Sequence, residues 1–223
     1  MKKQTHSADS HYPLAEEITN AITHGIGIVL GIIGLTVLMV FSIIHCGTKE
    51  ILSYLIYGIS FILLYTSSTL YHAIPYPKVK KILKKCDHIC IYLFIAGSYT
   101  PFLVLHMQSR TSFYILLTVW ITAACGTVFK LFYAGKWRFL STFFYVLMGW
   151  LIMIDGKALY NTLDKTALFY LFLGGLTYTF GALLYLIKKI PFNHALWHLC
   201  VLAASVFHYI AIFLSAKWNS LLL

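Results

Sequence analysis

The chain has 223 residues, of which 60% are hydrophobic and only 11% are charged. Soluble globular chains are about 45–50% apolar and about 25% charged, so a soluble protein of this size could not bury so much apolar surface in one core. Disorder requires the opposite balance of charge and hydrophobicity and is excluded as well. The composition therefore indicates an integral membrane protein.

Seven apolar stretches follow one another along the chain, each long enough to cross a bilayer as a helix. They cover approximately residues 22–45, 51–73, 88–107, 112–133, 139–155, 166–187 and 195–216. None alternates polar and apolar residues as the strands of outer-membrane barrels do. We therefore expect an all-α, seven-transmembrane helix bundle over residues 22–216, with a short polar segment, 1–21, before it and a short tail, 217–223, after it.

The distribution of basic residues predicts the orientation of this bundle in a cell membrane. If the N-terminus is cytoplasmic, the inner segments carry Lys2, Lys3, Lys78, Lys80, Lys81, Lys84, Lys85, Lys130, Lys136, Arg138, Lys188 and Lys189. The outer segments then carry Lys49, Arg110, Lys157, Lys165 and Lys217. This excess of basic residues inside is typical of multi-pass proteins, so we expect a cytoplasmic N-terminus and an extracellular C-terminus.

The net charge of +10 does not require a nucleic-acid partner. Nucleic-acid binding needs basic residues on one continuous face, whereas these are divided among short segments. The densest run, KVKKILKK at positions 78–85, is expected to form a cytoplasmic loop between the second and third helices. Such a loop would lie close to the anionic lipid headgroups of the inner leaflet.

Four ionisable residues from three distant parts of the sequence arrive at the inner membrane face. His72 ends the second stretch, Asp87 begins the third, and His194 and His198 open the seventh. The last two are four residues apart, so they project from the same side of a helix and could hold one metal ion together. With His72 they would form a three-imidazole site with an open position, which is typical of catalytic zinc.

Two further residues would complete a catalytic site. Asp87 could hold the metal-bound water and act as a general base, and Ser68, one turn before His72, could donate to a developing oxyanion. Each residue also has an ordinary structural interpretation. Asp87 could cap the third helix, Ser68 could bond to its own helix backbone, and a single interfacial histidine is usually a packing residue. The shared depth of the set favours the catalytic interpretation.

Other polar and small residues in the spans give weaker evidence of a functional role. Glu17, Asn20 and His24 share one helical face, where they could orient metal ligands or could form an interfacial polar stripe. His208 lies about 20 Å beyond His194 along the seventh helix, so we expect a packing or hydrogen-bonding role there. Small residues that suit close helix approach are Gly25, Gly27, Gly31 and Gly34 in the first stretch, and Gly174, Gly175 and Gly181 in the sixth.

Several segments together carry a family resemblance over essentially the whole chain. They are EITNAITH (17–24), STLYH (68–72), DHICIYLFIAGSYTP (87–101), HALWH (194–198) and the pair at 208–209. With these segments the chain resembles the hemolysin III branch of the progestin and adiponectin receptor family.

The resemblance implies a seven-helix fold unrelated to G-protein-coupled receptors, with a zinc site near the cytoplasmic side. In the family, zinc is held by histidines matching His72, His194 and His198. The aspartate matching Asp87 contacts the zinc-bound water, and the serine matching Ser68 lines the site. Alkaline ceramidases, which are more distant relatives, use a similar constellation to hydrolyse a lipid amide.

Three functions are compatible with these features. The first is a zinc-dependent hydrolase of a lipid amide or ester that enters from the bilayer. The second is a membrane-damaging cytolysin, although the helices lack a polar stripe wide enough for a water-filled channel. The third is a non-enzymatic lipid-homeostasis sensor or receptor with a zinc site, for which an open coordination position would have no use. Lipid pockets are lined by generic apolar side chains, so the sequence does not identify the lipid.

Overall fold

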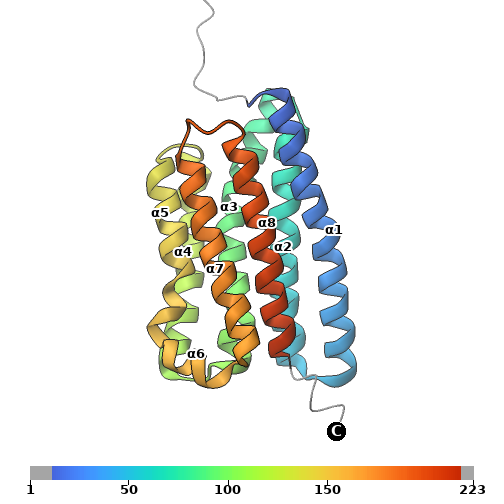
Figure 1. The fold of residues 1–223 in the computed structure, drawn as a ribbon, viewed down its shortest axis with the longest axis vertical. Helices are drawn as coiled ribbons and strands as arrows, with labels where there is room; N and C mark the ends of the chain where they lie inside the picture. Colours follow the sequence, from blue (N-terminus) through green and yellow to red (C-terminus); the bar gives the residue numbers. More distant parts are fainter. Residues whose placement is uncertain (1–11, 217–223) are drawn as a thin grey trace, which may run out of the picture.

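A computed structural model describes residues 12–216 as a bundle of helices (Figure 1). The elements are α1 (Leu14–His45), α2 (Thr48–Ala73), α3 (Pro77–Pro101), η1 (Phe102–His106), α4 (Arg110–Tyr133), α5 (Arg138–Gly149), η2 (Leu151–Asp155), α6 (Gly156–Thr162), α7 (Lys165–Leu186) and α8 (Asn193–Ser215). The described residues contain no β-strand. The predicted all-α class is therefore confirmed.

Seven helical segments are long and apolar enough to cross a membrane, as the sequence predicts. Five of them are single helices, while the third joins α3 to the π-helical η1 and the fifth joins α5 to η2 and α6. Because the number of crossings is odd, α1 begins at one end of the bundle and α8 ends at the other (Figure 1). The predicted tail at 217–223 and three residues used for the predicted orientation, Lys2, Lys3 and Lys217, lie outside the described residues.

The start of α3 corrects one expectation from the sequence. The run KVKKILKK at 78–85 is not a loop, because α3 begins at Pro77 and includes the whole run. Proline is favoured in the first turn of a helix, where its missing N–H needs no partner, and lysine is a good helix former. Hydropathy does not detect this extension, because the added turns are polar. Similarly, α1 begins at Leu14, eight residues before the first apolar stretch.

Glycines bring the helices close together at the predicted places. A Cβ atom at Gly27 or Gly31 of α1 would lie within 3.0 Å of an aromatic ring of α2, and one at Gly174 or Gly181 of α7 would meet side chains of α8 equally closely. Gly25 and Gly175 are exceptions, since a Cβ there would have its nearest neighbour at 4.0 and 3.5 Å, which is ordinary van der Waals distance. Small residues thus let backbones of the membrane helices approach each other.

The outer surface of the bundle is apolar. Exposed large hydrophobic side chains lie on every spanning segment, among them Ile33 on α1, Ile59 on α2, Phe132 on α4 and Phe180 on α7. In water such a surface would drive aggregation, whereas lipid tails accept it without cost. The buried ionisable side chains instead lie inside the bundle, toward the end at which α2 finishes and α8 starts: Glu16, Glu17, His24, His72, Asp87, Lys130, His194 and His198.

Candidate metal centre

Three histidines lie where the sequence predicts them, on two helices that meet at one end of the bundle. His72 is in the last turn of α2, whereas His194 and His198 occupy the first two turns of α8. The side-chain amide of Asn193 donates to the backbone carbonyls of Tyr185 and Ile187, which fixes the start of α8 against the end of α7. The local structure therefore positions the two α8 histidines.

The ring nitrogens of these histidines converge on one point. His194 Nε2 lies 3.2 Å from His72 Nε2 and 3.1 Å from His198 Nε2. The three ligand atoms all lie within 4.8 Å of one another, and all three residues are buried. Two such nitrogens can share at most one proton. The lone pairs that remain then need a Lewis acid to bind. A single metal ion would meet that need, and this group could hold one.

Residues of α1 and α3 fix the orientation of His72. Its Nδ1 lies 2.6 Å from Glu17 Oε2, while the Asn20 side-chain amide lies 3.4 Å from the same nitrogen. The other carboxylate oxygen of Glu17 pairs with Lys80 Nζ at 2.9 Å. A carboxylate accepts hydrogen bonds, so Nδ1 carries the proton and Nε2 keeps its lone pair for a metal. This arrangement is the one expected of residues that orient a ligand.

The two α8 histidines are held by aromatic and backbone contacts from α1 and from Tyr12, two residues before it. His24 stacks on His198 with ring centroids 3.6 Å apart, and Tyr12 stacks on His194 at 4.6 Å. The backbone N–H of His194 donates to Glu16 Oε1 at 3.2 Å. Glu17, Asn20 and His24 therefore all face the histidine group, as the ligand-orienting alternative predicts, and they do not form an interfacial stripe.

Tyr12 and Glu16 are contacts that the sequence analysis missed. Burial raises the pKa of the Tyr12 phenol above its usual value, so this ring packs on His194 in its neutral form. Neither residue carries a recognisable motif. Only their position in the chain could have indicated them. Because α1 starts at Leu14, its first turn and the residues just before it reach the histidines.

Asp87 lies inside α3, not at its start. The helix begins ten residues earlier at Pro77, so Asp87 cannot cap it and that structural interpretation is wrong. Ser68 is fully buried on α2 and lies beside the Asp87 carboxyl. Its hydroxyl makes no hydrogen bond of ordinary geometry, not even to its own helix backbone. Among the described residues, Asp87 is not one of the group whose ligand atoms lie together.

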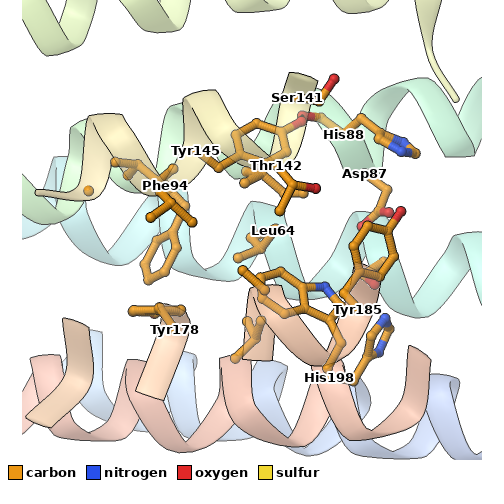
Figure 2. A pocket seen from close by; sticks show the side chains of 18 of the residues that line it. Leu64, Asp87, His88, Phe94, Ser141, Thr142, Tyr145, Tyr178, Tyr185 and His198 are labelled. Carbon is orange, nitrogen blue, oxygen red and sulfur yellow. The ribbon is translucent and has the colours of Figure 1, made fainter. Parts of the chain in front are cut away.

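A cavity of about 350 Å³ joins these residues into one site. Ser68, Asp87, His194 and His198 line one end of it. In Figure 2, Asp87, Tyr185 and His198 lie toward one end of the cavity, whereas Phe94 and Tyr178 lie toward the opposite, more apolar end. Small-molecule sites have volumes of this order and a similar mixture of apolar walls and a few polar groups. The site can therefore present a small-molecule or lipid group to the histidines.

His208 has the role expected from its depth. Its Nε2 lies 3.2 Å from the backbone carbonyl of Leu171 on α7, and it belongs to the wall of the cavity away from the three histidines. It is a hydrogen-bonding residue between α7 and α8. It is not a member of the histidine group that could hold a metal.

Fold and site together define a class: a seven-helix membrane protein with a buried three-histidine group beside an internal cavity. The family model described as haemolysin-III related matches residues 12–209. The chain belongs to this family, the hemolysin III branch of the progestin and adiponectin receptors.

Individual relatives support the same conclusion. The chain is 46% identical to the hemolysin-3 homolog of Bacillus subtilis (strain 168) over 194 residues, which cover 87% of this chain and 91% of the relative. It is 43% identical to hemolysin-3 of Bacillus cereus over 190 residues, 85% of this chain and 87% of the relative. Human monocyte to macrophage differentiation factor is 34% identical over 203 residues, covering 88% and 83% of the two chains.

Proposed function

We propose that this protein is a zinc-dependent hydrolase of a lipid amide or ester. The observation that carries the proposal is the convergence of three buried imidazole nitrogens beside a cavity, whose wall includes two of these histidines, His194 and His198, together with Asp87 and Ser68. Three protein ligands leave one tetrahedral position open for a reacting group, which is the usual arrangement in catalytic zinc sites.

The spacing of the nitrogens supports zinc as the metal. Two nitrogens bound to one tetrahedral zinc ion at the usual bond lengths lie about 3.3 Å apart. The two neighbouring pairs in the group are separated by 3.2 and 3.1 Å. Neutral imidazoles suit zinc well, and the Glu17 carboxylate on His72 is a common partner of a zinc-bound histidine. When bound, the ion would polarise a carbonyl and lower the pKa of a water to about 7.

Asp87 and Ser68 would do the remaining chemistry. Asp87 would accept a proton from the attacking water and pass it to the leaving amine or alcohol. The Ser68 hydroxyl, which lies beside the Asp87 carboxyl and makes no hydrogen bond to its own helix backbone, would donate to the carbonyl oxygen as negative charge develops on it. His24 and Tyr12 would keep the α8 imidazoles in place and exclude water from two sides.

The apolar part of the cavity supports a lipid substrate. Leu64, Ile91, Phe94, Val146 and Val201 line it between the histidines and the more distant His208. A hydrocarbon chain can occupy such a space, because its transfer from lipid costs little. The scissile amide or ester would then lie at the polar end.

A second function follows from the name of the Bacillus cereus relative, hemolysin-3, which refers to lysis of blood cells. A sensor or receptor that uses the same metal group is the third. Both can be tested in the experiment that tests the hydrolase.

The full chain, purified in neutral detergent, is first analysed for bound metals. It is then incubated with membrane lipids and with red-cell ghosts, and the lipids are compared by mass spectrometry.

We expect about one zinc ion per chain and release of a fatty acid or a lyso-lipid. His198→Ala should lose both the metal and the product. His208→Ala, which removes a histidine on the same helix outside the group, should keep the metal. Metal without any lipid product would contradict the hydrolase and favour the sensor, whereas leakage of the ghosts without hydrolysis would favour the cytolysin.

A further inference from the structure

A buried lysine lies on the cavity wall without a carboxylate partner. Lys130, near the end of α4, is 1% exposed. Its ammonium group donates to the Ser141 hydroxyl of α5 and lies 5.9 Å from the centre of the Tyr145 ring. Lys130 takes part in neither of the ion pairs that Glu17 forms, with His72 and with Lys80.

The position of Lys130 is not that of an ordinary interfacial lysine. Lysines at the ends of membrane helices normally extend their side chains outward, so that the ammonium group reaches water or lipid headgroups. Lys130 instead turns inward, toward Ser141 and the cavity. A buried ammonium group without an anion is costly, so a fold that retains one either keeps it neutral or receives an anion from outside the chain.

A second cation, Arg138, lines the same cavity. The Arg138 guanidinium stacks on the Tyr185 ring at 3.7 Å from the ring centre, and its buried Nε has no hydrogen-bond partner. Arg138 and Lys130 both line the cavity, together with Lys84, Lys136 and Lys188. Asp87 is the acidic residue of this lining, so positive charge predominates.

The Ser141 hydroxyl accepts from Lys130 and keeps its own proton for a ligand, whereas the Thr142 hydroxyl donates to the backbone carbonyl of Arg138; both residues line the cavity (Figure 2). An oxyanion with several acceptor oxygens, such as phosphate, matches a guanidinium, an ammonium and hydroxyl groups gathered on one wall. The opposite end of the cavity is lined by Phe94 and Tyr178, which suit a hydrocarbon chain (Figure 2).

We propose that the wall formed by Lys130, Arg138 and Ser141 binds a phosphate group, carried by a lipid whose hydrocarbon chain occupies the apolar end of the cavity. The assignment of this lipid as a substrate rests on the proposed hydrolysis, whereas its binding does not. Lys130 and the histidine group then act on two parts of one ligand, the first on its headgroup and the second on its carbonyl.

The experiment compares three probes on the full chain in neutral detergent: a lysophosphatidate, the monoacylglycerol with the same acyl chain, and inorganic phosphate. Binding is measured by the change in thermal unfolding temperature and by native mass spectrometry. Each titration is repeated after treatment with a chelator, so that direct binding of phosphate to a metal at the histidines is excluded. No turnover is needed for either readout.

We expect the lysophosphatidate to bind at least about tenfold more tightly than the monoacylglycerol, which corresponds to one charge-assisted hydrogen bond. Lys130→Met and Arg138→Gln should each remove most of this preference. Lys81→Met, which removes an equal charge from an exposed position outside the cavity, should retain it. Arg138 is only partly buried, so the Arg138 variant tests the site even if Lys130→Met does not fold.

Equal binding of the charged and neutral lipids would overturn the proposal, as would a preference that survives in both variants. Inorganic phosphate that binds as tightly as the lysophosphatidate would overturn the lipid as the source of the phosphate. Hydrolysis of neutral lipids without any preference for the charged one would contradict this site and leave the proposed function intact. The opposite result, binding without hydrolysis, would contradict only the proposed function.

Discussion

His72 Nδ1 lies 2.6 Å from Glu17 Oε2, although 55 residues separate the two along the chain. Glu17 also pairs with Lys80, so one carboxylate connects α1, α2 and α3 at the end of the bundle that holds the histidines. A hydrogen bond of this kind fixes which nitrogen of an imidazole carries its proton. The polar start of α1 is therefore part of the candidate metal centre.

The first prediction follows from this contact. Glu17→Gln keeps the size of the side chain and removes its charge, so His72 is held less firmly and becomes a weaker ligand. The affinity for zinc should fall by about 10–100-fold, the usual effect of losing such a partner. Competition with a chromogenic chelator would measure the affinity.

Glu50→Gln is the matched control. Glu50 accepts a hydrogen bond from the backbone N–H of Gly47 at the start of α2, at the opposite end of that helix from His72. Its replacement removes the same charge and should leave the affinity for zinc unchanged. Equal effects of the two substitutions would mean that Glu17 acts only through the overall charge of the protein.

The second prediction concerns the contact between α1 and α2. A Cβ atom at Gly27 would lie 2.1 Å from the Tyr65 ring, and the hydroxyl of Tyr65 donates to Ser205 on α8. Gly27→Ala should therefore displace a ring that connects two helices and should lower stability by about 1–3 kcal/mol. Thermal unfolding in detergent, followed by circular dichroism, would measure this.

Gly25→Ala provides the opposite expectation on the same helix. The nearest neighbour of a Cβ there would be 4.0 Å away, so alanine fits without strain. Alanine is also the better helix former by about 1 kcal/mol, and the unfolding temperature should stay constant or rise. If both variants lose stability equally, close approach at Gly27 is not the cause.

The third prediction concerns orientation. Lys81 and Lys157 are exposed and lie near opposite ends of the bundle, on α3 and α6. If basic residues mark the cytoplasmic side, a cysteine at Lys157 should react with an impermeant thiol reagent in intact cells. A cysteine at Lys81 should react only after permeabilisation. The unmodified chain, with its five native cysteines, gives the background. The reverse pattern would place the histidine group on the outer side.

Sequence reasoning reached the seven spans and the histidine group because both depend on local signals. A bilayer requires about 20 apolar residues per helix, and the spacing of His194 and His198 fixes their common face. To place His72 beside these two histidines, the sequence analysis also had to compare the membrane depth at which each helix ends. The structure places His72 beside them, so the topology of the helices is enough to predict that these residues meet.

Other parts of the site could not be found in this way. Hydropathy missed the helical turns at 14–21 and 77–87, because polar residues there face the protein interior or the membrane surface. Lys130 looked like one basic residue among twelve at the inner face, and only its packing against Ser141 shows that it points inward. Side-chain direction is set by tertiary contacts that no short sequence pattern encodes.

The last prediction separates catalysis from structure at Asp87. Asp87→Asn keeps the shape of the side chain and removes its basicity. If Asp87 accepts a proton during hydrolysis, zinc should remain bound to the three imidazoles while turnover falls by about 10²–10⁴-fold, the usual contribution of a general base. Metal analysis and lipid mass spectrometry on one preparation would measure both quantities. Loss of zinc would instead make Asp87 a direct ligand, contrary to its absence from the described group of converging ligand atoms. A helix-capping role is already excluded, because α3 starts at Pro77.

Ser68→Ala serves as the companion variant, since it removes a buried hydroxyl beside Asp87 without changing any charge. It should lower turnover less than Asp87→Asn, because it removes one hydrogen bond to the developing oxyanion and leaves proton transfer intact. Full activity in Asp87→Asn would overturn the catalytic role of Asp87.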